Sequence, residues 1–107
     1  MKPEEPGRFQ ISVGTTKGRL TLVLEGALDG AAAWEVIRRL EACERQAYPV
    51  ALDLNGVTTI HWLAARILTS SLEYITKTKG GVWLCLPGRS CEMFRAEVLR
   101  PDFWTIR

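Results

Sequence analysis

The pattern of apolar and polar residues changes its period in the middle of the chain. Apolar residues alternate over Val50–Leu54, which is the pattern of a strand with one face on the core, and an Asn-Gly pair at 55–56 is expected to end that strand. From Trp62 the apolar residues recur every three or four positions until Gly80-Gly81, as in an amphipathic helix that ends at a glycine. The centre of the chain is therefore predicted to be a strand, a polar loop and a long helix.

The helical period divides the predicted central helix into two faces. Its inward face should pack on the core, and its outward face should meet solvent. The inward face consists of Ala64, Ile67, Leu68, Ser71 and Ile75, and the outward face consists of Trp62, Arg66, Thr69, Glu73 and Lys77. The sequence thus predicts that a large aromatic side chain projects from the first helical turn.

The residues before this segment predict a hairpin and a first helix. Apolar residues alternate over residues 9–13 and again over residues 20–24, with turn-forming residues between them, which indicates two antiparallel strands. Asp29 is then well placed to cap a helix. The apolar stripe of that helix is Ala33, Val36, Ile37, Leu40 and Cys43.

The residues after the central helix predict a strand, a short helix and a last strand. Val82–Leu86 is a continuous apolar run, as in a strand covered on both faces, and Pro87-Gly88 ends it. Ser90 is expected to cap a helix through about Leu99, and residues 103–106 to form the last strand. The expected fold is a single α/β domain over residues 9–107, with the order β-β-α-β-α-β-α-β and a mixed sheet of four to five strands, after a flexible tail at residues 1–8.

Composition narrows the class of protein. The formal charge of +2 is small and the basic residues are scattered among acidic ones, which argues against nucleic-acid binding. No apolar run approaches the roughly 20 residues of a membrane span, and no signal segment is evident at the N-terminus. We therefore expect a cytoplasmic protein with no membrane span.

The cysteines and three of the tryptophans are expected to be structural. Cys43, Cys85 and Cys91 are odd in number, lack metal-ligand spacing and lie in apolar settings, so reduced core thiols are the prediction. Large aromatic residues within or beside apolar elements usually belong to the core or to its edge. We expect this of Trp34, Trp83 and Trp104.

Several of these features together resemble the STAS domain of bacterial anti-sigma-factor antagonists. They are the Gly26-Ala27-Leu28-Asp29 turn into the first helix, the central strand, loop and helix, and the Gly80-Gly81 pair before a hydrophobic strand. The resemblance extends from about Phe9 to Ile106. It implies a STAS-like fold, a role in transcription regulation and signalling, and docking of a protein partner at the start of the central helix.

The phosphorylation motif of that family does not match this chain. Antagonists carry aspartate, serine, serine or alanine, and glycine at the start of the central helix, where His61, Trp62, Leu63 and Ala64 stand here. Phosphorylation would add about −1.5 to −2 charge at a helix N-terminus, where the helix dipole favours anions. The resemblance therefore implies a STAS domain without the serine switch. The alternative is that phosphorylation has moved to Thr58 or Thr59, and of these two residues Thr59 is the candidate.

The partner-binding residues are expected around the loop and the helix start. Trp62 with Leu63 and Arg66 resembles the aromatic and arginine anchors that dominate interface energy, although burial of the indole under the preceding loop is equally compatible with the pattern. The purely structural interpretation of Thr59 is that its side chain caps the helix. The expected partner-binding set is Thr58, Thr59, His61, Trp62, Leu63 and Arg66.

No catalytic, cofactor-binding or metal-binding residues are predicted. His61 is the only histidine, so neither a His-His metal site nor a Ser-His-Asp arrangement can be assembled. The carboxylates fall in the tail, at helix surfaces or at caps, and no Gly-rich phosphate loop precedes a helix. We expect a non-enzyme without cofactors.

The favoured hypothesis is a regulatory protein-interaction domain. Its expected partners are an anti-sigma factor or kinase, or other STAS proteins. The alternative is a STAS-like accessory subunit of a bacterial lipid-transport ATPase complex, or a small-ligand-binding regulatory domain. Because relatives continue into another helix after the last strand, we also expect an apolar surface here that favours a homodimer.

Overall fold

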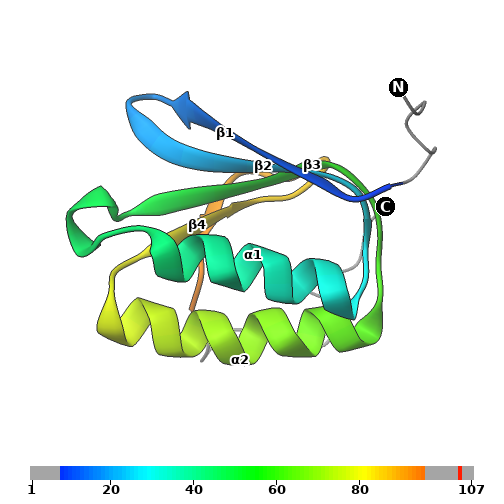
Figure 1. Cartoon of the computed structure of the whole chain (residues 1–107). Helices are drawn as coiled ribbons and strands as arrows, with labels where there is room; N and C mark the ends of the chain where they lie inside the picture. Colours follow the sequence, from blue (N-terminus) through cyan, green and yellow to red (C-terminus); the bar gives the residue numbers. More distant parts are fainter. Residues whose placement is uncertain (1–7, 96–103, 105–107) are drawn as a thin grey trace, which may run out of the picture.

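The computed structural model describes residues 8–95 and Trp104, and they form a sheet covered by two helices. Figure 1 shows both helices on the same face of the sheet. The elements in chain order are β1 (Gln10–Thr16), β2 (Arg19–Leu28), α1 (Gly30–Ala42), the 3-10 helix η1 (Arg45–Ala47), β3 (Val50–Ile60), α2 (Trp62–Thr78), β4 (Val82–Cys85) and β5 (Glu92–Met93).

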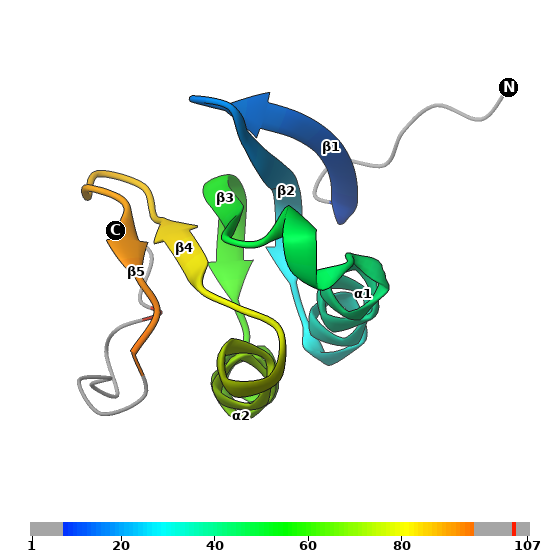
Figure 2. The same cartoon turned by 90° about the vertical axis from the view of Figure 1, so that its left-hand side faces the viewer.

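The sheet is mixed and has five strands in the order β1-β2-β3-β4-β5. The outer pairs β1/β2 and β4/β5 are antiparallel, whereas β2, β3 and β4 are parallel neighbours. α1 and α2 are the crossovers between these parallel strands, so they run in the same direction (Figures 1 and 2). This confirms the prediction of an α/β domain with a mixed sheet, including the N-terminal hairpin.

The core lies between the sheet and the two helices. Alternate residues of β2, β3 and β4 face the helices, and each helix turns its apolar stripe toward the sheet. The largest fully buried side chains, each less than 2% exposed, are Leu24, Leu28, Leu40, Leu52, Leu54, Leu68, Leu72, Ile75, Leu84, Val36, Val50 and Val82. Leu72 replaces Ser71 on the predicted inward face of α2, because Ser71 is only half-buried.

The central strand is longer than the alternation predicted. β3 continues past Asn55-Gly56 to Ile60, because it keeps pairing with β2 as far as Leu28 opposite Ile60. The register shifts twice along this pair, so the alternation of side chains is interrupted without ending the strand. The loop predicted before α2 is therefore mostly strand.

The helix predicted from Ser90 is wrong over the described residues. Glu92–Met93 form β5 instead, with Met93 paired to Trp83, and the N–H of Phe94 donates to the Val82 carbonyl at 2.8 Å. The edge of β4 pairs with the backbone of these residues, so they form a strand and not the first turn of the predicted helix. Residues 96–99 of that helix lie outside the described residues, as do residues 1–7 of the predicted tail and, apart from Trp104, the predicted strand at 103–106.

The prediction of three reduced core thiols is also wrong. Cys85 and Cys91 form a disulfide, because the chain reverses between them and brings β5 back beside β4. Cys43 is free but only half-buried, since α1 ends one residue before it. Disulfides are typical of oxidising compartments, so this bond does not favour the cytoplasmic location expected from the sequence, which stays a prediction.

The three tryptophans expected in the core differ in their surroundings. Trp104 is 6% exposed, as predicted, and its indole N–H donates to the Thr69 hydroxyl at 2.9 Å. Trp83 is half-buried beneath the guanidinium of Arg19, which lies 5.0 Å from the ring centroid. Trp34 is 55% exposed, so its predicted burial is wrong: it falls outside the stripe of α1 that faces the sheet. Among the described residues, neither helix has the length and apolarity of a membrane span.

Candidate functional site

The two long helices begin side by side at one edge of the sheet. β2 and β3 are parallel and end together, with Leu28 opposite Ile60. The next residues, Asp29 and His61, are the N-caps of α1 and α2. Since the carboxyl ends of parallel strands meet at one edge, this edge gathers two capping side chains and two first helical turns (Figure 1).

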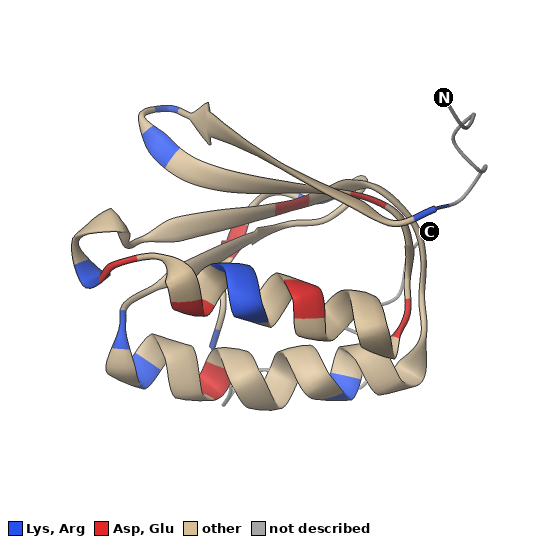
Figure 3. Cartoon of the chain, viewed as in Figure 1, with Lys and Arg blue, Asp and Glu red and all other residues tan. Residues whose placement is uncertain are grey.

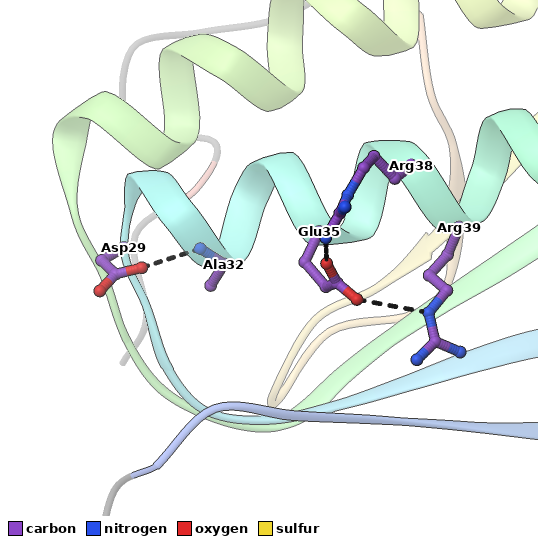
Figure 4. A network of polar contacts seen from close by, with 5 residues as sticks. All are labelled: Asp29, Ala32, Glu35, Arg38 and Arg39. Atoms are coloured by element: carbon purple, nitrogen blue, oxygen red, sulfur yellow. Dashed lines mark hydrogen bonds and ion pairs between the residues drawn. The ribbon is translucent and has the colours of Figure 1, made fainter.

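α1 is fixed at this edge by the capping carboxylate that the sequence predicted. The Oδ1 of Asp29 accepts a hydrogen bond from the Ala32 N–H at 2.8 Å (Figure 4). One turn further along, Glu35 forms ion pairs with Arg38 and Arg39, and the hydrogen bond from Arg38 is the main reason that the pKa of Glu35 is lowered. The carboxylates nearest the site are thus engaged in helix structure.

α2 is capped by His61 and not by Thr59. The Nδ1 atom of His61 accepts from the Leu63 N–H at 3.1 Å, and the His61 N–H donates to the Leu28 carbonyl at 2.9 Å. Thr59 cannot take this role because it belongs to β3, paired with Ala27. Its predicted capping is therefore wrong. The imidazole centroid lies 5.6 Å from that of the Trp62 ring.

The structure settles whether Trp62 is exposed. Trp62 is 63% exposed to solvent, and the next residue, Leu63, is 42% exposed. Arg66 follows one turn later and is also exposed. All six predicted partner-binding residues are exposed, and we name this segment, from the end of β3 into the first turns of α2, the α2 corner: Thr58, Thr59, His61, Trp62, Leu63 and Arg66.

A close contact with α1 positions the α2 corner. A Cβ atom placed on Gly30 would lie 3.1 Å from Cδ2 of Leu63 and 3.8 Å from Cδ1 of Ile67. The absence of a side chain on Gly30 therefore lets the first turn of α2 approach the first turn of α1. Sequence reasoning missed this contact, because the two residues are far apart in the chain and no local pattern joins them.

Two further exposed aromatic residues were not anticipated as surface features. Trp34 on α1 is 55% and Tyr74 on α2 is 63% exposed. A signal for Trp34 exists in the sequence, since it lies off the stripe formed by Val36, Ile37 and Leu40. The exposed large apolar side chains of the described residues therefore lie mainly on the two helices, with Val13 of β1 as the remaining one.

The α2 corner combines exposed apolar side chains with exposed polar and basic ones. Among residues 8–95 and 104, no three histidine, cysteine or acidic side chains gather as metal ligands would. The Nδ1 atom of His61 is engaged by the helix backbone, and Thr58 and Thr59 are exposed residues. What the corner offers is exposed apolar area beside a guanidinium.

No protein-family model and no curated protein sequence matches this chain at a significant level. Among solved structures, the crystal structure of Mglu is similar to it, with a TM-score of 0.63 at 22% sequence identity. The similarity covers 73% of this chain but only 20% of the length of Mglu. At this level of identity the likeness shows the fold alone.

Proposed function

We propose that this chain is a non-enzymatic interaction domain of STAS type that docks a protein partner through the α2 corner. The observation that carries the proposal is the exposure of Trp62 and Leu63 in the first turn of α2. The exposure of apolar tryptophan and leucine surface to water is unfavourable in free energy, and burial of that surface against a partner is favourable.

The residue types at the α2 corner support a protein partner. Tryptophan and arginine are enriched among residues that dominate binding energy, and here Trp62 and Arg66 lie one helical turn apart. The polar residues Thr58 and Thr59 lie beside them at the end of β3, as a polar rim surrounds an apolar anchor.

The proposed family rests on the resemblance of the sequence, and the observed geometry is compatible with it. The segment from Gly26 to Asp29 ends β2 and enters α1, and Gly26 has a φ of +97°, which favours glycine at this position. The small α/β domain with a mixed sheet and two helices supports this proposal.

Binding is proposed to be constitutive because the switch position is apolar. Trp62 and Leu63 are the first two residues of α2, where the family carries its phosphorylated serine. A phosphate at a helix N-terminus would be stabilised by free backbone N–H groups, but neither side chain can accept one. Phosphorylation of exposed Thr59 is the alternative that the experiment below distinguishes.

The experiment identifies the partner first and measures affinity second. A photoreactive phenylalanine analogue in place of Trp62 would cross-link the partner in the source cells, and mass spectrometry would identify both the partner and any phosphorylated residue. We expect an anti-sigma factor of kinase type or another STAS protein. A transporter ATPase subunit, or phosphate on Thr59, would contradict the proposal.

Affinity of the purified partner then tests the anchors by calorimetry. Trp62→Ala is expected to weaken binding by more than about 1 kcal/mol, roughly fivefold in Kd, and Leu63→Ala by a smaller amount. Val13→Ala is the control, because Val13 is 60% exposed on β1 and belongs to the other layer of the molecule. Equal affinity of the wild type and Trp62→Ala, with folding unchanged, would refute the assignment of the anchor.

A further inference from the structure

The solvent-facing side of α2 carries residues of opposite charge at equal distances on either side of its midpoint. Its residues recur every three or four positions, so they form one stripe along the helix. This stripe, which we name the α2 outer face, consists of Trp62, Arg66, Ser70, Glu73 and Lys77. Four of the five residues are exposed, and Glu73 is partly exposed, with 47% of its side chain accessible to solvent.

We propose that the α2 outer face binds the same face of a second copy of this chain, with the two α2 helices antiparallel about a two-fold axis. The axis would pass between Thr69 and Ser70, the midpoint of the stripe. The proposal goes beyond the partner docking proposed above, and because both use Trp62 and Arg66, a copy engaged in this dimer could not dock a partner at the α2 corner at the same time.

Charge complementarity is the main argument for a second copy. Arg66 and Glu73 are equally far from the midpoint, so an antiparallel pair sets Arg66 of each copy opposite Glu73 of the other. Arg66 makes none of the ion pairs found among residues 8–95 and 104. Glu73 pairs with Lys77 in its own helix through Oε1 at 3.6 Å, an exposed contact that leaves Oε2 for a second cation.

The middle of the stripe is small enough for close approach. Ser70 lies nearest the proposed axis and is exposed, while Thr69 is turned aside because its hydroxyl accepts the Trp104 indole N–H. Helices with small residues at the crossing approach to about 8–10 Å between axes. At that separation the charged side chains on either side of the axis reach one another.

The ends of the stripe match in the same way. Trp62 and Lys77 are equally far from the midpoint, so the ammonium of one copy meets the indole of the other, a favourable cation–π arrangement. Leu63 and Tyr74, which are 42% and 63% exposed, lie almost symmetrically beside them and add apolar area. The charged and aromatic residues of the stripe, Trp62 with Lys77 and Arg66 with Glu73, thus stand at mirror positions about the same point.

The alternative arrangements fit less well. Parallel α2 helices would place Arg66 against Arg66 and Glu73 against Glu73. If the partner were a different protein, the charged residues of α2 would not need to lie at equal distances from the midpoint of the helix. Charges of both signs are also present on α1, but there Glu35 already pairs with Arg38 and Arg39 (Figures 3 and 4).

Charge reversal tests the proposal by sedimentation equilibrium of the purified full chain, without any partner, from about 10 µM to about 1 mM, as suits a small interface. The wild type should dimerise reversibly. Arg66→Glu or Glu73→Arg alone should weaken the dimer more than about tenfold, because each creates two like-charge contacts. Glu44→Arg, in an exposed turn, should leave the dimer unchanged.

Rescue makes the test specific. An equal mixture of the two single variants should form a heterodimer, and the double variant R66E/E73R should again form a homodimer, because both restore opposite charges across the axis. A monomeric wild type over this range, a dimer indifferent to the single reversals, or a double variant as weak as the single ones would overturn the proposal. Sedimentation is measured without a partner, so loss of the dimer would leave a cross-link from Trp62 to a different protein as evidence for partner docking. A cross-link from Trp62 to a second copy of this chain would instead support the dimer.

Discussion

Replacement of Gly80 by alanine is expected to be among the most destabilising small changes in the chain. Gly80 follows α2 with a φ of +156°, at the edge of the region that side chains rarely adopt. A Cβ atom there would lie 2.6 Å from Cβ of Tyr48 and 3.1 Å from its Cγ. The new methyl group would thus meet the root of the Tyr48 side chain, which cannot rotate away.

The magnitude follows from how firmly Tyr48 is held. Its hydroxyl donates to the Leu40 carbonyl at 2.7 Å, so a shift of the ring breaks a hydrogen bond at the end of α1. Overpacking costs about 1–3 kcal/mol and an unfavourable backbone conformation about 1–3 kcal/mol more. Gly80→Ala should therefore lower the free energy of unfolding by about 2–6 kcal/mol.

Urea unfolding followed by circular dichroism measures this loss, with two other glycines as controls. Gly88 has a φ of +71°, but a Cβ there meets none of the described atoms within 4 Å, so Gly88→Ala should show only the backbone cost. Gly14 lacks both features, and Gly14→Ala should be neutral or slightly stabilising because alanine is the more ordered residue in the unfolded chain. If Gly80→Ala and Gly88→Ala lose the same stability, the steric argument is refuted.

Three further predictions concern capping, titration and the disulfide. Asp29→Ala should lower the free energy of unfolding by about 1 kcal/mol in the same assay, and Asp29→Asn by less, because the carboxylate caps α1. Burial raises the pKa of Tyr48 from 10.0 to about 12, so the stabilisation from its neutral phenol should be complete below pH 10 and lost as pH rises through about 12; tyrosinate absorbance should show this late titration, and Tyr48→Phe should abolish it. Iodoacetamide should label Cys43 alone in the native protein, whereas labelling of Cys85 and Cys91 without reductant would contradict the disulfide. Reduction should cost about 2 kcal/mol, as expected for so short a loop.

The elements that the sequence predicted well are those whose pattern is local. The hairpin, the stripe of α1 and the start of α2 at Trp62 each depend on residues within a few turns or one strand of each other. The failures depend on pairing with distant residues. β3 outlasts its alternation because β2 lies beside it, and residues after Ser90 form a strand because β4 offers an edge.

The candidate site divides along the same line. Thr58, His61 and Trp62 could be grouped from sequence because they are neighbours in the chain. The exposure of Trp62 depends on where the helix axis points relative to the sheet, which periodicity does not determine at the first turn. The contact of Leu63 with Gly30 depends on the parallel arrangement of two crossovers, and nothing in either local segment indicates it.

That contact also bears on the docking proposed for the α2 corner. The backbone of His61 is bonded to Leu28 of β2, its ring caps α2, and Leu63 rests against Gly30 of α1. Trp62 is therefore held in place by its neighbours' backbone and packing, although its own ring is largely in solvent. An anchor held in this way loses little conformational freedom when a partner covers it, so more of its burial appears as affinity. It follows that a change at Gly30, which displaces Leu63, should weaken docking at the α2 corner even though Gly30 itself need not touch the partner.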